Sequence, residues 1–459
     1  MLDVTSFVAG IAATALIAVI VWRLFRRSID ATRQEALQLR REIEHRQTEA
    51  DASLETMTDR IDRVERSLAS LRFKLTAPVL HDPYPDSFSL GRTTLSRSIV
   101  GPPIDLPSDL AERPLDWKPR RPLAEHDTDQ DKPRPYEEIT VFYSTDRRPA
   151  GRRWHYGSER SNLRYGQCRV TVPTERQIGT IPLPGFLLRT IRVEVRRWHF
   201  TMDAVDEQSG AEFLSGLRTA IHGTPEKQAL VFIHGFNVSF VDAVYRTAQI
   251  AVDLEFDGPA ILYSWPSAGE FTPAAYAYDQ EQAIWTLRHL RPFLEMLADD
   301  TGAERIHLLA HSMGNQALTS ALLQLAPTLR RRPVFHELVL TAPDIDTDMF
   351  SNDIAPAILG VARRSTLYAS SQDIALDFSR RLHGYPRAGD SGEEIVLVNG
   401  MDSIDVSAVS TDFLGHGYYG SNDSVLSDMH YLIKGLQISD RHGLRQQSRN
   451  AQPYWVFRP

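Results

Sequence analysis

Cysteine is almost absent from this sequence: Cys168 is the only one among 459 residues. An internal disulfide is therefore excluded, and a single thiol fits a reducing compartment. A surplus of basic residues is also missing, because 51 lysines and arginines stand against 59 aspartates and glutamates, for a formal net charge of −8. Since nucleic-acid binding draws on clustered positive charge, we expect no nucleic-acid partner.

Other signatures are missing too. The sequence contains no evident internal repeat, no glycine-rich phosphate loop and no histidines, cysteines or carboxylates at metal-ligand spacing. It therefore predicts neither a metal nor another cofactor. Hydrophobic residues make up 42% of the chain, which at this length is enough for a large core.

The most informative feature present is the run IHLLAHSMGN at residues 306–315. Its apolar residues predict a strand that leads directly into Ala-His-Ser-Met-Gly, and residues 316–325 have the composition of a helix. A serine at such a turn, between the small residues Ala310 and Gly314, is typical of a nucleophile elbow, although Ala310 replaces the usual first glycine. The turn strains the serine backbone, and the helix N-terminus behind it stabilises negative charge. Ser312 is the predicted nucleophile.

A second motif, ALVFIHGFNVSF at residues 229–240, begins with a short apolar strand. His234 and Gly235 follow that strand, and a glycine there lets the backbone come close to a substrate. The pair alone would indicate only a turn. Its position before the serine motif favours a role in the same site.

These motifs resemble the α/β-hydrolase superfamily, and more narrowly a bacterial esterase/lipase-like family of undefined function (DUF900-type). The resemblance covers about residues 137–440 and implies a mostly parallel central sheet and a hydrolytic reaction, but no particular substrate. It also implies an oxyanion hole built from the backbone amides of Phe236 and Met313. The motifs that carry it are VFYSTDR (141–147), YGSER to LRYG (156–166), FIHGFNVSF (232–240), YSWPSAG (263–269), LLAHSMGN (308–315), APDID (342–346) and GHGYYGSN (415–422).

In this fold the catalytic acid lies between the serine and the histidine in chain order, on a loop at the carboxyl edge of the sheet. Apolar runs after the serine predict strands at 338–340, 366–368 and 395–398. Asp373 follows the second of them, where the superfamily most often places the acid, and is the predicted acid. Asp344 follows the first and is the alternative acid. For either aspartate, a helix N-cap is the non-catalytic interpretation.

His416 is the predicted base, because it lies between two glycines in a turn-rich loop after the last predicted strand. Such a loop can present an imidazole to the serine. His383 precedes that strand, and His430 lies in a run with helical spacing, so both are poorly placed. His311, beside the nucleophile, is expected to be structural or to line the pocket.

Three further side chains near these motifs are possible pocket residues. Trp265 follows a strand predicted at 260–263, where it would either line an acyl or leaving-group pocket or pack in the core. Tyr418, beside the predicted base, has the same two interpretations. His234 is the third.

The N-terminus, residues 1–27, predicts a transmembrane anchor. Residues 6–25 are apolar except for Thr14 and Arg23, a length close to that of a membrane span. No basic residue precedes the run and arginines follow it. We therefore expect an uncleaved single-pass anchor in the inner membrane, with the rest of the chain in the cytoplasm.

Residues 28–75 predict a helical coiled coil. From Leu54 to Leu75, apolar residues recur at alternating spacings of three and four, which gives an a/d seam of about three heptads. A lone charged helix packed on its own domain is the alternative. Tethering to a membrane raises the effective concentration of the seam, so we expect a parallel homo-oligomer of unspecified number.

The remaining segments complete the predicted organisation. Residues 76–136 are rich in proline and predict a linker, while residues 441–459 are assigned to a C-terminal tail. Between them, the hydrolase domain at 137–440 is expected to begin with partly antiparallel strands. Those early strands are predicted at 139–146, 168–174 and 191–200.

Two functions of different classes fit these features. The first is a membrane-anchored serine hydrolase that cleaves a small-molecule or lipid acyl ester through an acyl-enzyme; the same triad also performs thioester and amide hydrolysis. The second is a non-enzymatic membrane scaffold with a hydrolase-like domain. A complete Ser–Asp–His order favours the first, because a decayed site is expected to lose a member.

Overall fold

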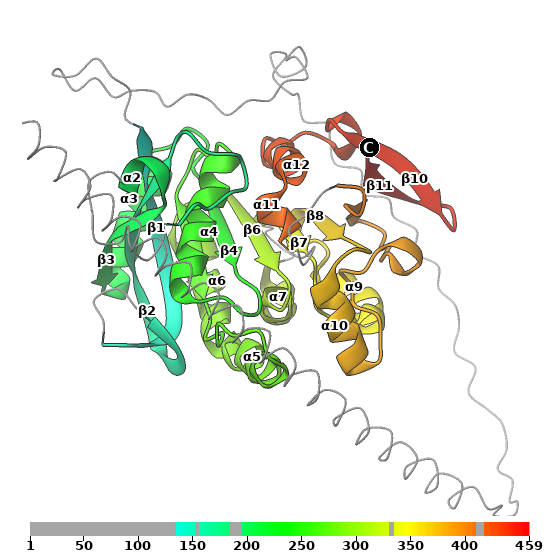
Figure 1. Cartoon of the computed structure of the whole chain (residues 1–459), viewed down its shortest axis with the longest axis horizontal. Coiled ribbons are helices and arrows are strands. Elements are labelled where there is room, and N and C mark those ends of the chain that lie inside the picture. Colours follow the sequence, from blue (N-terminus) through cyan, green and yellow to red (C-terminus); the bar gives the residue numbers. More distant parts are fainter. Residues whose placement is uncertain (1–134, 152–155, 184–194, 330–334, 410–416, 459) are drawn as a thin grey trace, which may run out of the picture. The chain divides into compact units, whose positions relative to one another are not determined.

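The computed structural model describes residues 135–151, 156–183, 195–329, 335–409 and 417–458. An 11-stranded sheet runs through them in the order β10-β11-β9-β8-β7-β6-β4-β5-β1-β2-β3 (Figure 1). The strands are β1 (Tyr136–Pro149), β2 (Tyr156–Pro173), β3 (Thr201–Gln208), β4 (Gln228–Ile233), β5 (Ala260–Ser264), β6 (Arg305–His311), β7 (Phe335–Thr341), β8 (Ala362–Ala369), β9 (Asp402–Asp405), β10 (Leu444–Arg449) and β11 (Gln452–Phe457).

Neighbouring strands from β1 across to β11 run parallel. Antiparallel pairing is confined to the two ends of the sheet, where β1 pairs with β2, β2 with β3, and β10 with β11. The prediction of a mostly parallel sheet that begins with antiparallel strands is confirmed. Parallel strands place their carboxyl ends at one edge, where sites of such folds lie.

Helices connect the strands and cover both faces of the sheet. The longer ones are α3 (Gly210–His222), α4 (Phe240–Asp253), α5 (Pro273–Trp285), α6 (Leu287–Asp300), α7 (Gly314–Leu329), α10 (Ile374–His383) and α12 (Asp423–Ile433). Shorter turns of helix are α2 (Val195–Trp198), α8 (Thr347–Met349), the π-helical η2 (Phe350–Ile354), α9 (Ala355–Ile358), the 3₁₀ turns η3 (Gly392–Glu394) and η4 (Ile438–Asp440), and α11 (Tyr418–Ser421).

Local sequence explains where several of these helices begin. Ser209 caps α3 in a full capping box with Glu212, and Ser239 caps α4 through its side chain. Asp373 caps α10, which ends at Gly384 in the left-handed conformation. Such side chains satisfy backbone N–H groups that have no partner inside the helix, so each fixes the point at which a loop becomes a helix.

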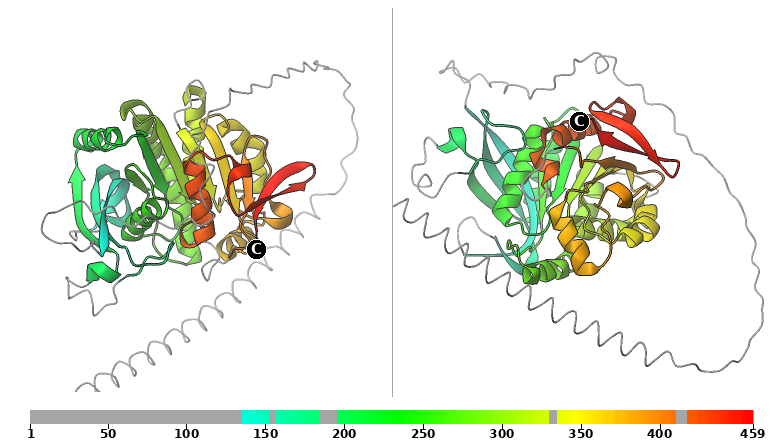
Figure 2. Two further views of the ribbon diagram at one scale, coloured as in Figure 1. Left: turned by 90° about the horizontal axis from the view of Figure 1, so that it is seen from above. Right: turned by 45° about the vertical axis from the view of Figure 1, so that its right-hand side comes forward.

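Two hydrophobic cores lie on opposite faces of the sheet, which makes the domain three-layered (Figure 2). Strand β4 shows the division, because Val231 and Ile233 face one core while Leu230 and Phe232 face the other. Helices α3, α6 and α7 pack in the first core, and α4 and α12 in the second. Since both faces are covered, the central strands are buried along nearly their whole length and read as continuous apolar runs.

Two predicted strands are wrong. Residues 395–398 have no strand structure: Ile395 and Val396 are buried in a loop, and Ser403 donates a side-chain hydrogen bond to the Val396 carbonyl. The last parallel strand before the His416 region is β9 instead. The strand predicted at 191–200 is likewise wrong. Residues 195–198 form the short helix α2, and the strand that pairs with β2 is β3, which begins after it. Apolar runs predict burial more reliably than they predict strand pairing.

The C-terminal residues belong to the sheet rather than to a separate tail. Strands β10 and β11 form a hairpin, and β11 pairs in parallel with β9. Leu444 and Phe457 are buried in the core on the α12 side. The domain boundary predicted at 440 is therefore too early.

The predicted anchor, coiled coil and all but the last two residues of the linker lie outside the described residues. Among the helices that the structure does describe, none combines the length and the apolar character needed to cross a membrane.

Candidate active site

Ser312 occupies the sharp turn between β6 and α7, with φ at +52°. This left-handed conformation is unusual for a residue with a side chain, and it matches a strained nucleophile elbow. Neighbouring groups hold the turn: the Ser312 amide donates to the Thr341 carbonyl at 3.0 Å. The Asn315 side chain donates to the Ser312 and Thr341 carbonyls, each at 3.0 Å. The end of β7 therefore fixes the position of the serine.

Glycines let the elbow contact the loop that follows β4. A Cβ added at Gly314 would lie 2.3 Å from the His234 carbonyl oxygen. A Cβ added at Gly235 would lie 2.9 Å from the Ser312 Cβ. Both approaches are possible only without side chains, so these two positions require glycine. This contact puts the loop beside the nucleophile, as the motif predicted.

The two predicted oxyanion donors sit on either side of this contact. Phe236 follows Gly235 in the loop, and Met313 follows Ser312 just before α7 begins. Within the part of the chain that the structure describes, neither backbone N–H donates a hydrogen bond. An oxyanion needs backbone N–H groups that are not already engaged, so these two amides on neighbouring segments fit that role.

The Arg147 side chain forms hydrogen bonds that hold the loop after β4 in place. It is 1% exposed, and its side chain donates to five acceptors, all of them neutral. Two belong to the oxyanion loop: the Val238 carbonyl at 2.7 Å and His234 Nε2 at 3.2 Å. The others are Ser264 Oγ and the carbonyls of Gly157 and Ser267. Burial lowers the pKa of Arg147 to about 10, so the guanidinium stays charged at neutral pH.

Asp279 on α5 supplies the opposite charge to the same loop. Its Oδ2 accepts from the Ser267 hydroxyl at 2.6 Å and from the Asn237 amide at 3.3 Å, and its Oδ1 accepts from the Ala268 amide at 2.7 Å. Ser267 Oγ in turn accepts from the Val238 amide at 3.1 Å. The loops after β4 and β5 are therefore joined by one polar network between Arg147 and Asp279.

Sequence reasoning missed both of these charged residues. Arg147 ends the motif VFYSTDR, which carries part of the family resemblance but by itself indicates no role for the arginine. Its signal is a charged residue at the end of an otherwise buried run of β1, and only the fold shows that the charge reaches the oxyanion loop. Asp279 lies on a helix and has no distinctive local pattern.

Replacing Arg147 with lysine is expected to lower kcat about 100-fold while changing KM little. A single ammonium cannot make the five directed bonds, and an ångström-scale shift of an oxyanion donor costs about that much. Steady-state kinetics on an acyl ester would measure the split. Arg148→Lys is the matched control, because Arg148 is exposed and its side chain pairs with Glu159 at the surface. An unchanged kcat in a folded Arg147→Lys protein would show that Arg147 does not position the site.

His234 and Trp265, two of the possible pocket residues, pack beneath the oxyanion loop, and for Trp265 this fits the interpretation of a core aromatic. Both side chains are fully buried, and their rings stack with centroids 5.0 Å apart. Trp265 Nε1 donates to the His234 carbonyl at 2.7 Å. Burial and the neighbouring Arg147 charge lower the pKa of His234 well below its usual value, so the ring is neutral. His234 and Trp265 therefore pack against the loop and support it. The side chain of Tyr418, another possible pocket residue, lies outside the described residues.

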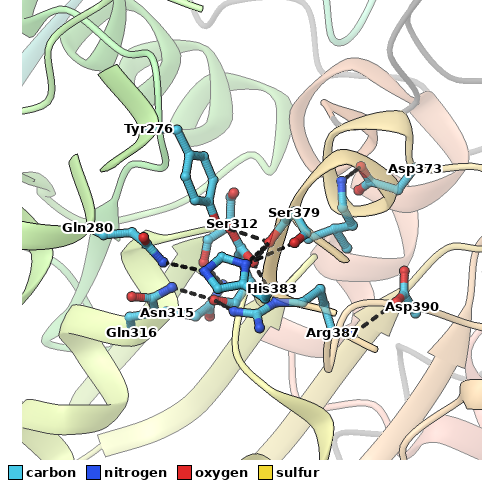
Figure 3. Close-up of polar contacts among 12 residues, drawn as sticks. Tyr276, Gln280, Ser312, Asn315, Gln316, Asp373, Ser379, His383, Arg387 and Asp390 are labelled. Atoms are coloured by element: carbon cyan, nitrogen blue, oxygen red, sulfur yellow. Dashed lines mark hydrogen bonds and ion pairs between the residues drawn. The ribbon is translucent and has the colours of Figure 1, made fainter. Parts of the chain in front are cut away.

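Asp344, the alternative acid, is buried and makes hydrogen bonds to Tyr276, Ser379 and Arg387, three residues that Figure 3 labels. Its Oδ2 accepts from the Tyr276 hydroxyl at 2.6 Å, and its Oδ1 accepts from the Ser379 hydroxyl at 2.5 Å and from Arg387 Nε at 2.8 Å. Burial and this carboxylate raise the pKa of Tyr276, so the phenol remains a donor. The Asp344 amide contacts the Ser312 carbonyl at 3.4 Å. The carboxylate thus joins α5, α10 and the loop before η3.

Asp373, the predicted acid, lies outside that network at the carboxyl end of β8 (Figure 3). It is 3% exposed, and its Oδ1 accepts from the Leu376 amide at 2.9 Å. The N-cap interpretation of this residue is therefore correct, and a catalytic role is compatible with it, because a carboxylate has several acceptor positions.

His416 lies outside the described residues. Description of the chain starts again at Gly417, and Tyr419 in α11 stacks on His311 with ring centroids 4.1 Å apart. His311 directly precedes Ser312, so the segment that follows His416 packs against the nucleophile elbow. His311 itself is 6% exposed and takes part in this stack, in keeping with a structural role.

His383 and His430, which the sequence places poorly for catalysis, make other interactions. His383 Nδ1 donates to the Ser379 carbonyl at 2.8 Å, which leaves Nε2 to accept from Gln280 at 2.8 Å. His430 on α12 is buried and contacts the Leu254 carbonyl through Nδ1 at 2.7 Å. Both interactions are those of packing residues.

Comparison with known proteins agrees with the fold. Residues 209–434 match the family of α/β hydrolases of unknown function, DUF900. This match spans just under half of the chain and includes the elbow, the oxyanion loop and both aspartates, so this part of the chain resembles the α/β hydrolases. No curated protein matches it.

Solved structures give only a distant likeness. One is described as a candidate cell surface hydrolase from Lactobacillus plantarum WCFS1, with 14% identity, a TM-score of 0.27, and coverage of 46% of this chain and 94% of that one. A gene product from Listeria innocua shows 10% identity, a TM-score of 0.28, and coverage of 46% and 96%.

Proposed function

We propose that the protein is a serine hydrolase that cleaves carboxylic esters through an acyl-enzyme. In this mechanism Ser312 attacks the carbonyl and His416 takes its proton. The Phe236 and Met313 amides stabilise the tetrahedral oxyanion. The observation that carries the proposal is the left-handed Ser312 at the β6–α7 turn, in contact with Gly235 and between two amides that make no hydrogen bond within the described residues.

Asp373 is the proposed acid that orients His416. It follows β8 at the carboxyl edge of the sheet, and β8 is the neighbour of β9, after which His416 comes in the chain. Asp344 is a poorer choice because its two oxygens already serve Tyr276, Ser379 and Arg387. A carboxylate that already forms an ion pair with a guanidinium is also a weaker acceptor for an imidazolium, because the guanidinium balances the negative charge of the carboxylate.

Aromatic side chains near the oxyanion loop favour an acyl group as the substrate. The Phe236 ring packs on Tyr276 and Phe271, with centroids 5.3 and 5.7 Å apart, and Phe271 is 50% exposed. Phe378 on α10 contacts both Tyr276 and Phe271. An exposed apolar surface beside a polar reaction centre suits the acyl chain of a small-molecule or lipid ester.

The test of reaction class uses matched substrates. p-Nitrophenyl esters of increasing acyl length, with the corresponding thioester and anilide, would be hydrolysed by the purified full-length protein. We expect kcat/KM to be highest for an ester and to fall for the anilide. A preference for the thioester or anilide would support the alternatives of thioesterase or amidase. Failure to hydrolyse any of them or to react with a fluorophosphonate would support a non-enzymatic membrane scaffold.

We also propose that residues 1–27 anchor the protein in the inner membrane with the hydrolase domain in the cytoplasm, on the charge pattern of the N-terminus. A C-terminal fusion to green fluorescent protein is expected to fluoresce, and a fusion to alkaline phosphatase is expected to be inactive. Active phosphatase, or a mature chain that begins after the apolar run, would contradict this topology.

The proposed coiled coil gives a further prediction, on assembly. A fragment from Ser28 to the C-terminus is expected to form an oligomer, and one from Tyr136 to be a monomer that keeps esterase activity. Ile61→Asp with Leu68→Asp should dissociate the longer fragment, because each carboxylate would be buried in the seam. Light scattering measures all three. A monomeric longer fragment would show that the heptads do not drive assembly.

A further inference from the structure

A cluster of two histidines and a glutamate lies at the amino-terminal edge of the sheet, away from Ser312. His307 is near the start of β6, and His336 and Glu337 are near the start of β7. Ser312 follows the other end of β6. The potential ligand atoms of His307, His336 and Glu337 all lie within 4.8 Å of one another. Spacing along the sequence gave no sign of this cluster, because β6 and β7 meet only in the folded sheet.

An irregularity in strand pairing brings the three side chains together. Ile306 pairs with Phe335, but the next residue, His307, pairs with Glu337. His336 is therefore an extra residue, as in a β-bulge. Successive residues of a regular strand point to opposite faces, and a bulge interrupts this alternation. It lets two consecutive residues of β7 approach His307.

Hydrogen bonds leave a lone pair available on His307. The Gln228 Nε2 group donates to the Asp257 carbonyl at 3.0 Å, so Gln228 Oε1 is the acceptor that faces His307 Nε2 at 3.2 Å. His307 then carries its proton on Nε2 and keeps the lone pair on Nδ1. The residue is fully buried, and Nδ1 has no hydrogen-bond partner within the described parts of the chain.

Glu337 is arranged in a similar way. Its Oε1 accepts from Arg364 Nε at 2.9 Å and Nη2 at 2.6 Å, and it contacts His336 Nδ1 at 3.0 Å. Its Oε2 is buried and, among the residues described, has no partner. A buried carboxylate oxygen and a buried imidazole nitrogen without partners are costly unless a further group satisfies them.

Arg364 does not block a cation here, because most of its donors are used elsewhere. It also donates to the carbonyls of Leu432, Gly435 and Leu436 at the C-terminal end of α12, where the helix dipole is negative. Its bonds to Oε1 hold the carboxylate in place and leave Oε2 available. Second-shell partners of this kind orient the ligands of metal sites.

We propose that His307, His336 and Glu337 form a binding site for a divalent transition-metal ion, with Zn²⁺ as the best fit. Two imidazoles and one carboxylate are a donor set typical of zinc, whereas Ca²⁺ and Mg²⁺ prefer oxygen ligands alone. Bond lengths near 2.1 Å put tetrahedral ligands roughly 3.5 Å apart, so binding draws the three side chains closer. The ion would join β6 to β7 and take no part in ester hydrolysis.

The test uses purified full-length protein that is stripped with a chelator and then dialysed against Zn²⁺ or Co²⁺. We expect one tightly held metal per chain by elemental analysis, and a visible Co²⁺ d–d spectrum characteristic of nitrogen and oxygen ligands. Zn²⁺ at about 100 times its Kd should raise the melting temperature by about 4–6 °C.

Variants separate this site from other histidines in the chain. His307→Ala and His336→Ala should each lose the Co²⁺ spectrum and the Zn²⁺-dependent shift in melting temperature. His222→Ala is the matched control, since His222 is exposed at the end of α3, and it should keep both. His336 is partly exposed, so its variant remains informative if His307→Ala fails to fold. The proposal is overturned if the wild-type protein holds no stoichiometric metal or if these two variants bind as the wild type does.

Discussion

Replacing Ser312 with alanine is expected to abolish covalent labelling by a fluorophosphonate and to lower esterase kcat by a factor on the order of 10⁴–10⁶. Without the hydroxyl no acyl-enzyme forms, and only the oxyanion donors and substrate binding remain. The backbone conformation should persist, because Asn315 and Thr341 hold the turn through main-chain groups. Gel fluorescence after labelling, with ester hydrolysis in parallel, measures the effect.

A matched control for this change is Ser371→Ala. Ser371 is an exposed serine on the loop after β8, and among the described residues its hydroxyl bonds only to Ser407. Labelling and hydrolysis should stay at wild-type levels in that variant. Persistent labelling of the Ser312→Ala protein would mean that another residue is the nucleophile.

The elbow and the central sheet could be predicted because their signals are local. At Ser312 the strand, the small flanking residues and the helix follow one another along the chain. Strands β4 to β8 read as apolar runs because both of their faces are covered. The edges of the sheet follow a different rule. Strand β10, with the sequence LRQQSR, is largely exposed, so hydrophobic pattern alone gives no indication of it.

Long-range polar contacts could not be predicted from the sequence. Arg147 reaches the oxyanion loop through Val238 and the loop after β5 through Ser267, and only the sheet order brings these groups together. The same holds for Asp344, whose partners come from α5, α10 and Arg387. Aspartates that follow predicted strands are candidate acids, and the sequence offers two of them, Asp344 and Asp373. It gives no indication that Asp344 forms part of a buried ion pair.

Because the two aspartates differ in this way, replacing each of them with asparagine should have a different effect. Asp373→Asn is expected to lower kcat by a factor on the order of 10⁴, because an amide no longer fixes the tautomer of His416 or stabilises its charged form. Asparagine caps helices as well as aspartate does, so the bond from the Leu376 amide should survive. The free energy of unfolding should therefore change by less than about 1 kcal/mol.

Asp344→Asn is expected to do the reverse. It leaves the buried Arg387 guanidinium without its carboxylate, and breaking such a pair costs about 3 kcal/mol or more of folding stability. Activity per folded molecule should stay within several-fold of the wild type, because the substitution removes no group that touches the reacting atoms. Asp377→Asn is the control on the same helix as Asp373, since Asp377 pairs with Arg380 and Arg381 at the surface. Urea unfolding and ester hydrolysis, both measured under conditions in which each variant is folded, separate the two effects. If Asp344→Asn lost more activity per folded molecule than Asp373→Asn, the acid would follow β7 rather than β8, and Asp344 would have to exchange Arg387 for the histidine during the reaction.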